Sequence, residues 1–261
     1  MTSIEKKLKS IDELYELKQR KLFINEIHPL VKLIVTLFYI VLAVSIDKYD
    51  LERMILMSLY IIIAYAMAEL SVRKALWRLK LILPLVIAVG IFNPIFDHSP
   101  GMYFGNTLIY AGWISMLTLM LKGIYSVLAA YLLIAVTGME EICYALRLIH
   151  VPKVLVTVIL LTYRYISILG SEADRIMTAY RLRAPKQKGI NYKVWGPMIG
   201  QWMLRSFDKA GRVYDAMLLR GFKGEFPSGR KYGFDRGAFI YLIVCAAALS
   251  AVRFVPLMSF A

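Results

Sequence analysis

The sequence predicts an all-α integral membrane protein with about five transmembrane helices and a cytoplasmic module of two long crossed helices. Hydrophobic residues make up 59% of the chain, and several apolar runs are longer than the strands of a water-soluble core. The formal net charge is +14. Its Lys and Arg residues interrupt apolar helices instead of forming a soluble basic module, which argues against a nucleic-acid partner. They report membrane orientation instead, because basic residues near spans stay cytoplasmic.

Residues 1–29 form a polar segment of mixed charge. We expect this segment to stay in the cytoplasm as an interfacial helix. It lacks the basic start, short apolar stretch and small-residue cleavage site of a signal peptide. The spans are therefore expected to insert as they stand.

Residues 30–137 are expected to form a region of four transmembrane helices. The apolar runs that predict them are 30–46, 54–68, 81–92 and 112–137. The connection after the first run is slightly acidic, whereas the stretch SVRKALWRLK at 71–80, after the second run, is basic and contains no acid. The first connection should therefore lie outside and the second inside. The Pro- and Gly-rich stretch after the third run predicts an outer loop. The fourth run would return the chain to the cytoplasm.

The apolar run that begins at Pro152 resembles a further span, but charge argues against a crossing there. Residues 171–236 contain fourteen Lys or Arg against six Asp or Glu, and a crossing would place them outside. Arg164 would cost about 2.5–3.5 kcal/mol at mid-depth in lipid. We therefore predict one long helix over 152–184, lying obliquely at the cytoplasmic face within a coupling module of residues 138–236. Residues 237–261 hold the C-terminal span.

A second long helix is predicted over 197–220, after a break at Gly196. Apolar residues recur along one stripe of this helix, which predicts that this face is buried. The stripe consists of Ile199, Trp202, Met203, Phe207, Ala210, Val213, Tyr214 and Met217. Small residues would let the two long helices cross closely. These residues are Gly170, Ser171 and Ala173 in the first helix, and Ala210 and Gly211 in the second.

Both long helices end in the same pattern of alanine, two residues, leucine, arginine and a small residue. The first copy is Ala179, Leu182, Arg183 and Ala184, followed by Pro185, and the second is Ala216, Leu219, Arg220 and Gly221. Each alanine precedes its arginine by four positions, so both lie on one helix face and the small residue leaves the arginine accessible. An arginine at a helix end also has a local explanation in the helix dipole. Repetition of the pattern favours a docking role.

These features resemble the transmembrane T component of energy-coupling factor (ECF) transporters, in its CbiQ-like cobalt branch. Members of that family carry two short Ala-Arg-Gly signatures at the ends of crossed coupling helices. This chain has Leu-Arg-Ala at 182–184 and Leu-Arg-Gly at 219–221. The stretch HPLVKLIVTL at 28–37 resembles the family's entry to the first span, and residues 151–183 resemble its long coupling helix. The resemblance covers nearly the whole chain.

The resemblance implies a multi-subunit importer in the cytoplasmic (inner) membrane of a prokaryote, with cobalt as its expected cargo. Arg183 and Arg220 would each insert into a groove on one of two ABC-type ATPase subunits and pair with acidic residues there. Arginine suits this role because its planar guanidinium binds carboxylates in a bidentate way, which lysine cannot reproduce. The apolar half of the first long helix would cradle a membrane-embedded substrate-binding (S) subunit, CbiM-like and accompanied by a small CbiN-like subunit.

The chain itself is expected to be non-catalytic. It contains no GxxxxGK[ST] phosphate loop, so ATP and Mg²⁺ are expected on the partner ATPases, and no cofactor is expected on this chain. The histidines and cysteines are isolated in the sequence and predict no metal site. They are His28, His98, His150, Cys143 and Cys245.

Two other functions remain open at this stage. One is a shared T component that serves vitamin-binding subunits. The other is an intramembrane lipid-modifying enzyme that holds an anionic headgroup with the basic module. The lack of clustered His, Cys or acidic residues argues against the enzyme. Glu140, Glu141 and Arg147, on a short cytoplasmic helix, are expected to be solvated or ion-paired locally.

Overall fold

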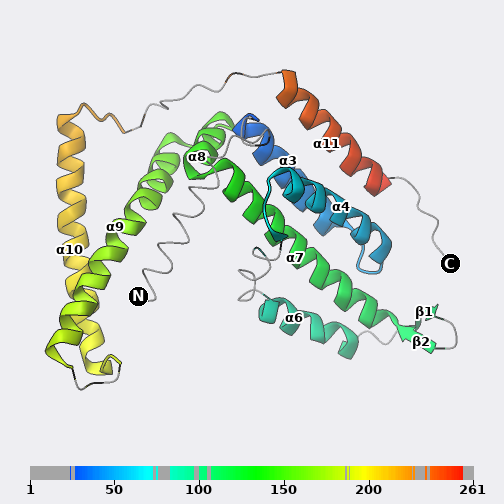
Figure 1. Ribbon diagram of the computed structural model, residues 1–261, viewed down its shortest axis with the longest axis horizontal. Helices are drawn as coiled ribbons and strands as arrows, with labels where there is room; N and C mark the ends of the chain where they lie inside the picture. Colours follow the sequence, from blue (N-terminus) through cyan, green and yellow to red (C-terminus); the bar gives the residue numbers. More distant parts are fainter. Residues whose placement is uncertain are drawn as a thin grey trace. The chain divides into compact units, whose positions relative to one another are not determined.

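A computed structural model describes residues 24, 27–72, 75, 83–96, 100–104, 107–185, 187, 189–224, 226, 233 and 236–254. The described long helices are α3 (Pro29–Ser45), α4 (Leu51–Met67), α6 (Leu83–Phe96), α7 (Ala111–Thr137), α8 (Met139–Leu148), α9 (Lys153–Arg183), α10 (Tyr192–Leu219) and α11 (Arg236–Phe254), as Figure 1 shows. This confirms the predicted all-α membrane class. The expected interfacial helix at the N-terminus lies outside the described residues. The chain forms two compact units, one centred on Met139–Lys231 and one formed by Leu17–Gly138 with Tyr232–Ala261.

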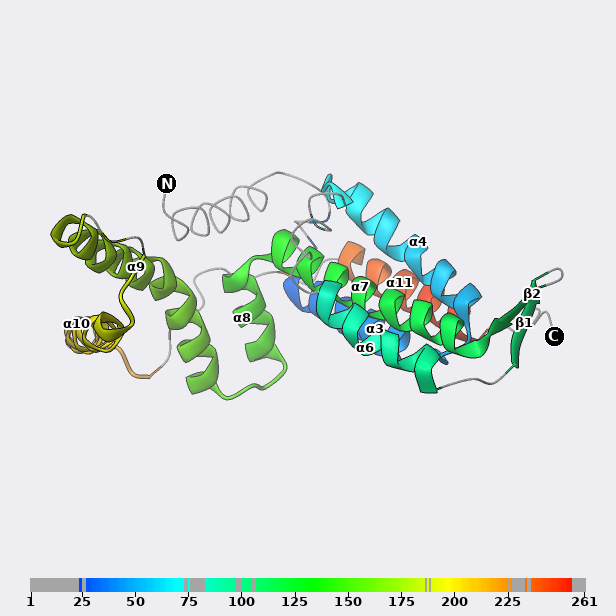
Figure 2. The same cartoon turned by 90° about the horizontal axis from the view of Figure 1, so that it is seen from below.

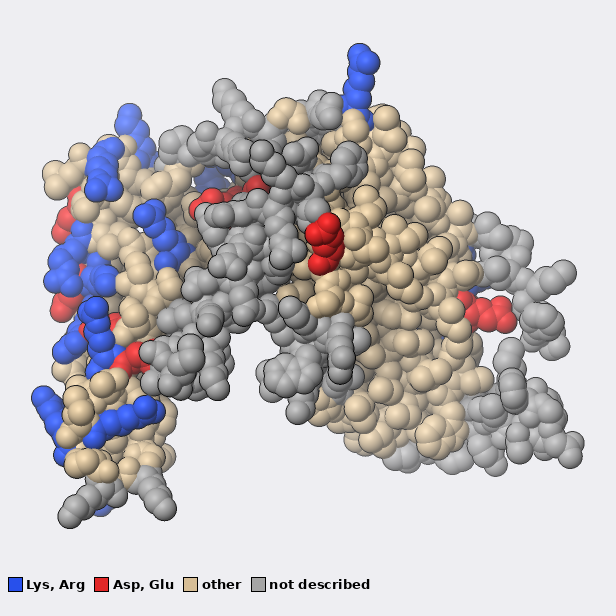
Figure 3. All heavy atoms as spheres, in the orientation of Figure 1, with Lys and Arg blue, Asp and Glu red and all other residues tan. Residues whose placement is uncertain are grey.

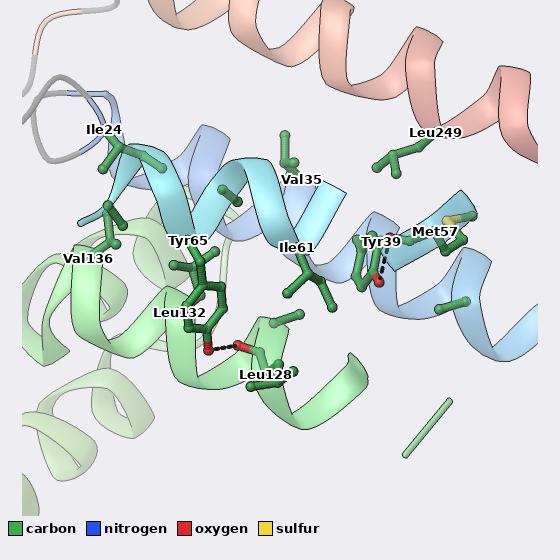
Figure 4. Close-up of a cluster of buried hydrophobic side chains, with 14 of the residues drawn as sticks. Ile24, Val35, Tyr39, Met57, Ile61, Tyr65, Leu128, Leu132, Val136 and Leu249 are labelled. Carbon is green, nitrogen blue, oxygen red and sulfur yellow. Dashed lines mark hydrogen bonds between the residues drawn. The ribbon is translucent and has the colours of Figure 1, made fainter. Parts of the chain in front are cut away.

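The larger unit is a helix bundle in which α7 packs against α3, α4 and α6, and α11 packs against α3 and α4. Tyr39 and Tyr65 are among its most deeply buried side chains. The hydroxyl of Tyr39 donates to the carbonyl of Met57 at 3.2 Å, and that of Tyr65 donates to Leu128 at 3.0 Å (Figure 4). These bonds satisfy polar atoms that burial would otherwise leave unpaired.

Lys122 has a structural partner inside this unit. Its ammonium group donates to the carbonyls of Val44, at 3.1 Å, and Ile46. These carbonyls lie at the C-terminal end of α3, where carbonyl groups lack partners within the helix. The lysine that interrupts the apolar run of α7 therefore caps another helix.

Close helix packing through small residues occurs between α6 and α7. A Cβ added to Gly123 would lie 3.1 and 3.2 Å from the two methyl groups of Val86, and one added to Gly90 would lie 3.3 Å from Met116. The amide of Asn93 donates to the hydroxyl of Ser115 at 3.0 Å. The bundle thus uses both means by which membrane helices associate, close backbone approach and interhelical hydrogen bonds.

The predicted outer loop between α6 and α7 contains a hairpin that the sequence reasoning missed. Strands β1 (Pro100–Phe104) and β2 (Thr107–Tyr110) pair antiparallel, with Tyr103 opposite Leu108 and Phe104 opposite Thr107. The described part of this loop is therefore a short two-stranded sheet.

The five apolar runs that were predicted to be spans coincide with the helices α3, α4, α6, α7 and α11. By length and composition, residues 112–137, 153–183 and 236–253 can each cross a bilayer, while α3 is a shorter apolar helix. That criterion also admits α9, which we expected not to cross. Large apolar side chains on α3 and α4 point outward, among them Val41 and Leu59. Such a surface suits contact with lipid and supports a multi-pass membrane protein.

Candidate coupling and docking site

The smaller unit presents α9 and α10 as a crossed pair joined by a short turn (Figures 1 and 2). Helix α9 has 31 residues, close to the predicted range, and is followed by Ala184 and Pro185. On the face that Figure 3 shows, Lys and Arg side chains gather over this pair, whereas the described residues of the bundle are mostly uncharged. The pair therefore carries a large share of the basic charge from which its cytoplasmic position was predicted.

Helix α10 begins at Tyr192, five residues before the predicted start. Asn191 caps the helix, because its side chain accepts from the Lys193 amide at 3.2 Å. Pro197 is the sixth helical residue, and it removes only the bond that its own amide would have made to Lys193. The prediction that Gly196 breaks the helix was therefore wrong.

The turn between the two helices is held by Tyr180. Its hydroxyl donates to the Gln187 side chain at 2.7 Å and accepts from the Asn191 amide at 3.2 Å. These bonds fix the last turn of α9 beside the first turn of α10. A cavity of about 640 Å³ opens here, lined in part by Arg181 and Trp195. Ala184 and Pro185, which follow the first signature arginine in the sequence, also line this cavity.

The two signature motifs end their helices in different ways. At Ala184 the backbone has φ −126°, and the Ala184 amide donates to the backbone carbonyl of Tyr180 at 3.0 Å. At Gly221 φ is +78°. The Gly221 amide donates to the Leu218 carbonyl at 2.9 Å, and the Phe222 amide donates to the Met217 carbonyl at 3.0 Å. This pair of bonds is a Schellman motif. Only the second motif needs a glycine, since left-handed backbone is disfavoured for other residues.

The predicted docking residues are accessible at both ends of the pair. Arg183 and Arg220 are exposed, as are Ala179, Ala216 and Gly221, and Ala184 is half-buried. The leucines before the arginines are unusually open, with 77% of Leu182 and 90% of Leu219 exposed. The 28 residues of α10 rise about 42 Å. Because Arg183 lies beside the start of α10 and Arg220 at its end, the two arginines occupy opposite ends.

Large side chains hold the crossing of α9 and α10. The indole N–H of Trp202 donates to the Leu169 carbonyl at 3.1 Å. The guanidinium of Arg205 lies 2.6 Å from the Glu172 carboxylate, and this hydrogen bond holds the pKa of Glu172 below its usual value. Arg175 approaches the same carboxylate at 3.6 Å. The sequence reasoning missed this pairing.

The predicted close crossing at small residues is not what the structure shows at Gly211. A Cβ built there meets no other atom within 4 Å. Ala210 is exposed as well, and so is Ser171, while Gly170 and Ala173 are half-buried next to Leu169 and Glu172. The prediction therefore placed the α9 side of the crossing within a few residues and misplaced the α10 side.

The apolar stripe of α10 is open rather than buried. None of the α10 side chains, all of which the structure describes, is buried. Within the predicted stripe, 65% of Phe207 and 53% of Tyr214 are exposed. The first half of α9 likewise exposes Val154 and Val158. Apolar surface of this extent on paired helices is typical of a surface that another protein or lipid covers.

Among the residues that the structure describes, no group of three or more His, Cys, Asp or Glu side chains could hold a metal ion. His28 instead caps α3, accepting from the Leu30 amide at 3.2 Å. Cys143 is buried, and His98 lies outside the described residues. The expectations of no metal, cofactor or catalytic group on this chain stay predictions.

Comparison with known proteins gives concordant matches. The family model described as CbiQ, cobalt transport protein, matches residues 20–232. The uncharacterized protein MJ1571 of Methanocaldococcus jannaschii is 26% identical over 212 residues, which cover 77% of this chain and 72% of that protein. The nickel permease LarQ of Lactiplantibacillus plantarum is 28% identical over 97 residues, 36% of each chain. The uncharacterized protein MJ1089 of Methanocaldococcus jannaschii is 30% identical over 107 residues, covering 41% of this chain and 39% of that protein.

Proposed function

The chain belongs to the CbiQ family of cobalt transport proteins, and from this premise we propose that it is the coupling subunit of an ECF-type ABC importer. Two cytoplasmic ATPases dock on the α9–α10 pair, one at Arg183 and one at Arg220. When the ATPases close on ATP, they move the two helix ends relative to each other. The crossed pair passes this motion to a membrane-embedded S subunit, and ATP and Mg²⁺ bind only to the ATPases.

The observation that carries this proposal is the exposed Leu-Arg pair repeated at both ends of the crossed helices. The helix dipole accounts for an arginine at either end. It does not account for leucines that are 77% and 90% exposed beside each arginine. Full burial of a leucine against a partner would contribute about 1.5–3 kcal/mol. A partner groove that takes an arginine and its neighbouring leucine explains both features at once.

Two separate ATPases fit the spacing of the arginines. A separation of about 42 Å, the rise of α10, is comparable to the size of a globular domain. Each arginine can therefore meet its own subunit. Trp202 and Arg205 join the helices near their crossing, so displacement of one docked end is transmitted to the other helix.

The open apolar faces of α9 and α10 provide the surface for the S subunit. They include Val154 and Val158 on α9 and Phe207 on α10. We place this pair at the cytoplasmic face of the inner membrane, because a crossing by α9 would carry the basic half of the pair outside. A CbiM-like S subunit with a CbiN-like partner is the proposed occupant.

Cobalt is the proposed cargo, held by the S subunit. The family description names cobalt, and one relative is named a nickel permease, so both ions belong in an uptake assay. A shared component for vitamin uptake is the alternative, and a vitamin-binding S subunit that co-purifies with this chain would favour it. No observation on the structure favours a lipid-modifying enzyme.

Co-purification with candidate ATPases tests the proposal. Arg183→Glu and Arg220→Glu should each weaken association about 30-fold or more, since reversing one charge leaves a buried partner charge unpaired. The double variant should lose both ATPases and all uptake. Arg212→Glu, an exposed site on α10 with the same charge change, is the matched control. Normal ATPase binding by the double variant would overturn the docking assignment.

A further inference from the structure

The chain turns back sharply after α10. We call residues 221–224 and 226 the return segment. Two glycines produce the reversal, Gly221 with φ +78° and Gly224 with φ +88°. Phe222 and Phe226 are half-buried and their rings lie 5.0 Å apart at 40°. This geometry is favourable for an aromatic pair and keeps the segment compact.

The return segment is bonded to α8 and to the beginning of α9. The guanidinium of Arg147, in the last turn of α8, donates to the carbonyl of Phe226 at 3.2 Å. The hydroxyl of Thr157, in the second turn of α9, lies 3.4 Å from the carbonyl of Gly224. Thr157 is one of three buried residues in α9. Hydrogen bonds from a charged donor are the stronger kind, so Arg147 is the principal anchor.

These bonds create a short path from Arg220 to the membrane helices. Along the helices, Arg220 is connected to α8 only through the whole of α10, the turn and α9. Through the return segment, Phe226 is only the sixth residue after Arg220, and its carbonyl accepts from Arg147 of α8. Only Gly138, with φ +71°, separates α8 from α7.

We infer that the return segment is a second force-transmitting connection, which ties the Arg220 end of α10 to α8 and so to span α7. Arg147 and Thr157 are positioning residues for this connection. The inference rests on the proposed function, because it requires an ATPase docked at Arg220. It extends that function by separating the two docked ends. The Arg183 end acts through the crossed helices, whereas the Arg220 end also acts directly on α8.

The roles of the anchors predict a loss of coupling without a loss of docking. Thr157→Val keeps the shape of the side chain and removes the donor. Thr162→Val is its matched control, because Thr162 is exposed and its hydroxyl donates to the carbonyl of Val158 in its own helix, at 2.8 Å. Arg147→Ala removes the stronger anchor, and Arg147→Lys restores a charged donor and should rescue part of the effect.

The test uses the complete complex, with three measurements on each variant. Hydrogen exchange at residues 221–226 should become about fivefold faster in Thr157→Val, as expected for loss of one hydrogen bond, and faster still in Arg147→Ala. Co-purification of both ATPases should stay normal. Uptake of radioactive cobalt(II) or nickel(II) per ATP hydrolysed should fall severalfold in Arg147→Ala, and Thr162→Val should match the unaltered chain.

Two results would overturn the inference. One is unchanged uptake per ATP despite faster exchange in the return segment. The other is loss of ATPase binding in parallel with uptake, which would make the anchors mere supports for Arg220. Failure of the unaltered chain to bind ATPases would instead overturn the proposed function, and the inference with it. The co-purification measurement therefore distinguishes the two failures.

Discussion

Replacing Gly211 with alanine should stabilise α10, because the position lies inside a helix and has free space around it. A Cβ added there meets no other atom within 4 Å. Alanine is therefore favoured over glycine by about 0.5–1 kcal/mol, since it loses less backbone entropy on folding. Gly200, in the same helix, has equally free space and should give the same gain. If the two helices instead crossed tightly at Gly211, the same substitution would destabilise α10.

At two other glycines, replacement by alanine should destabilise the protein, for a different reason at each position. Gly221 has φ +78°, and left-handed backbone costs about 1–2 kcal/mol once a Cβ is present. At Gly123, the new Cβ would lie 3.1 Å from a methyl group of Val86. Valine is stiff at χ1 within a helix, so rotation cannot relieve this contact, and we expect a loss of about 1–3 kcal/mol.

Amide hydrogen exchange on the purified chain measures these changes locally, which suits a chain of two compact units. A change of 1 kcal/mol in local stability alters the exchange rate about fivefold. Gly211→Ala should therefore slow exchange in α10 by roughly two- to fivefold. Gly221→Ala should accelerate exchange in the last turn of α10 alone. Faster exchange along α10 in Gly211→Ala would refute the reasoning, because the new methyl group would then be meeting a neighbour.

Two further predictions concern the ion pair between α9 and α10 and the cap at the start of α10. A double-mutant cycle of Arg205→Gln and Glu172→Gln should show favourable coupling at low salt that is screened at high salt. Because the pKa of Glu172 is lowered in the folded chain, this coupling is present at neutral pH and is lost as the pH falls through that lowered value; coupling independent of salt and pH would contradict an ion pair. Asn191→Ala should destabilise the start of α10 by about 1 kcal/mol, seen as faster exchange at the Lys193 amide, which the Asn191 side chain accepts from. Unchanged exchange at that amide would show that Asn191 is no cap.

Local patterns predicted most helices well, because their causes lie within a few residues. The end of α9 follows from Pro185, which cannot continue a helix. The start of α3 follows from Pro29 at its first position, with His28 as the cap. The start of α10 was misjudged because a Gly196-Pro197 pair usually breaks a helix. Here Asn191 supplies a cap earlier, and one lost hydrogen bond within the first two turns is tolerated.

Contacts between distant segments were harder to predict, because they depend on how elements cross. Small residues indicate where backbones can approach closely, and the structure uses them between α6 and α7. At the α9–α10 crossing, Trp202 and Arg205 instead reach across from one helix to the other. Each of these side chains bonds a residue 33 positions earlier in the sequence, so its partner is set by how α9 and α10 are aligned along each other. No local pattern contains that alignment.

The difference between the two signature motifs separates what the helix ends require from what a partner requires. Gly221 is demanded by its φ of +78°, whereas Ala184, at φ −126°, sits in a backbone that any residue can adopt. Local structure therefore explains why the last residue of the motif varies. Local structure does not explain why an exposed leucine and arginine precede that last residue in both motifs, although the two helices end in different ways. Because the Leu-Arg pair repeats while the local structure around it changes, its reason lies outside the helix, and the proposed docking of two ATPases would supply that reason.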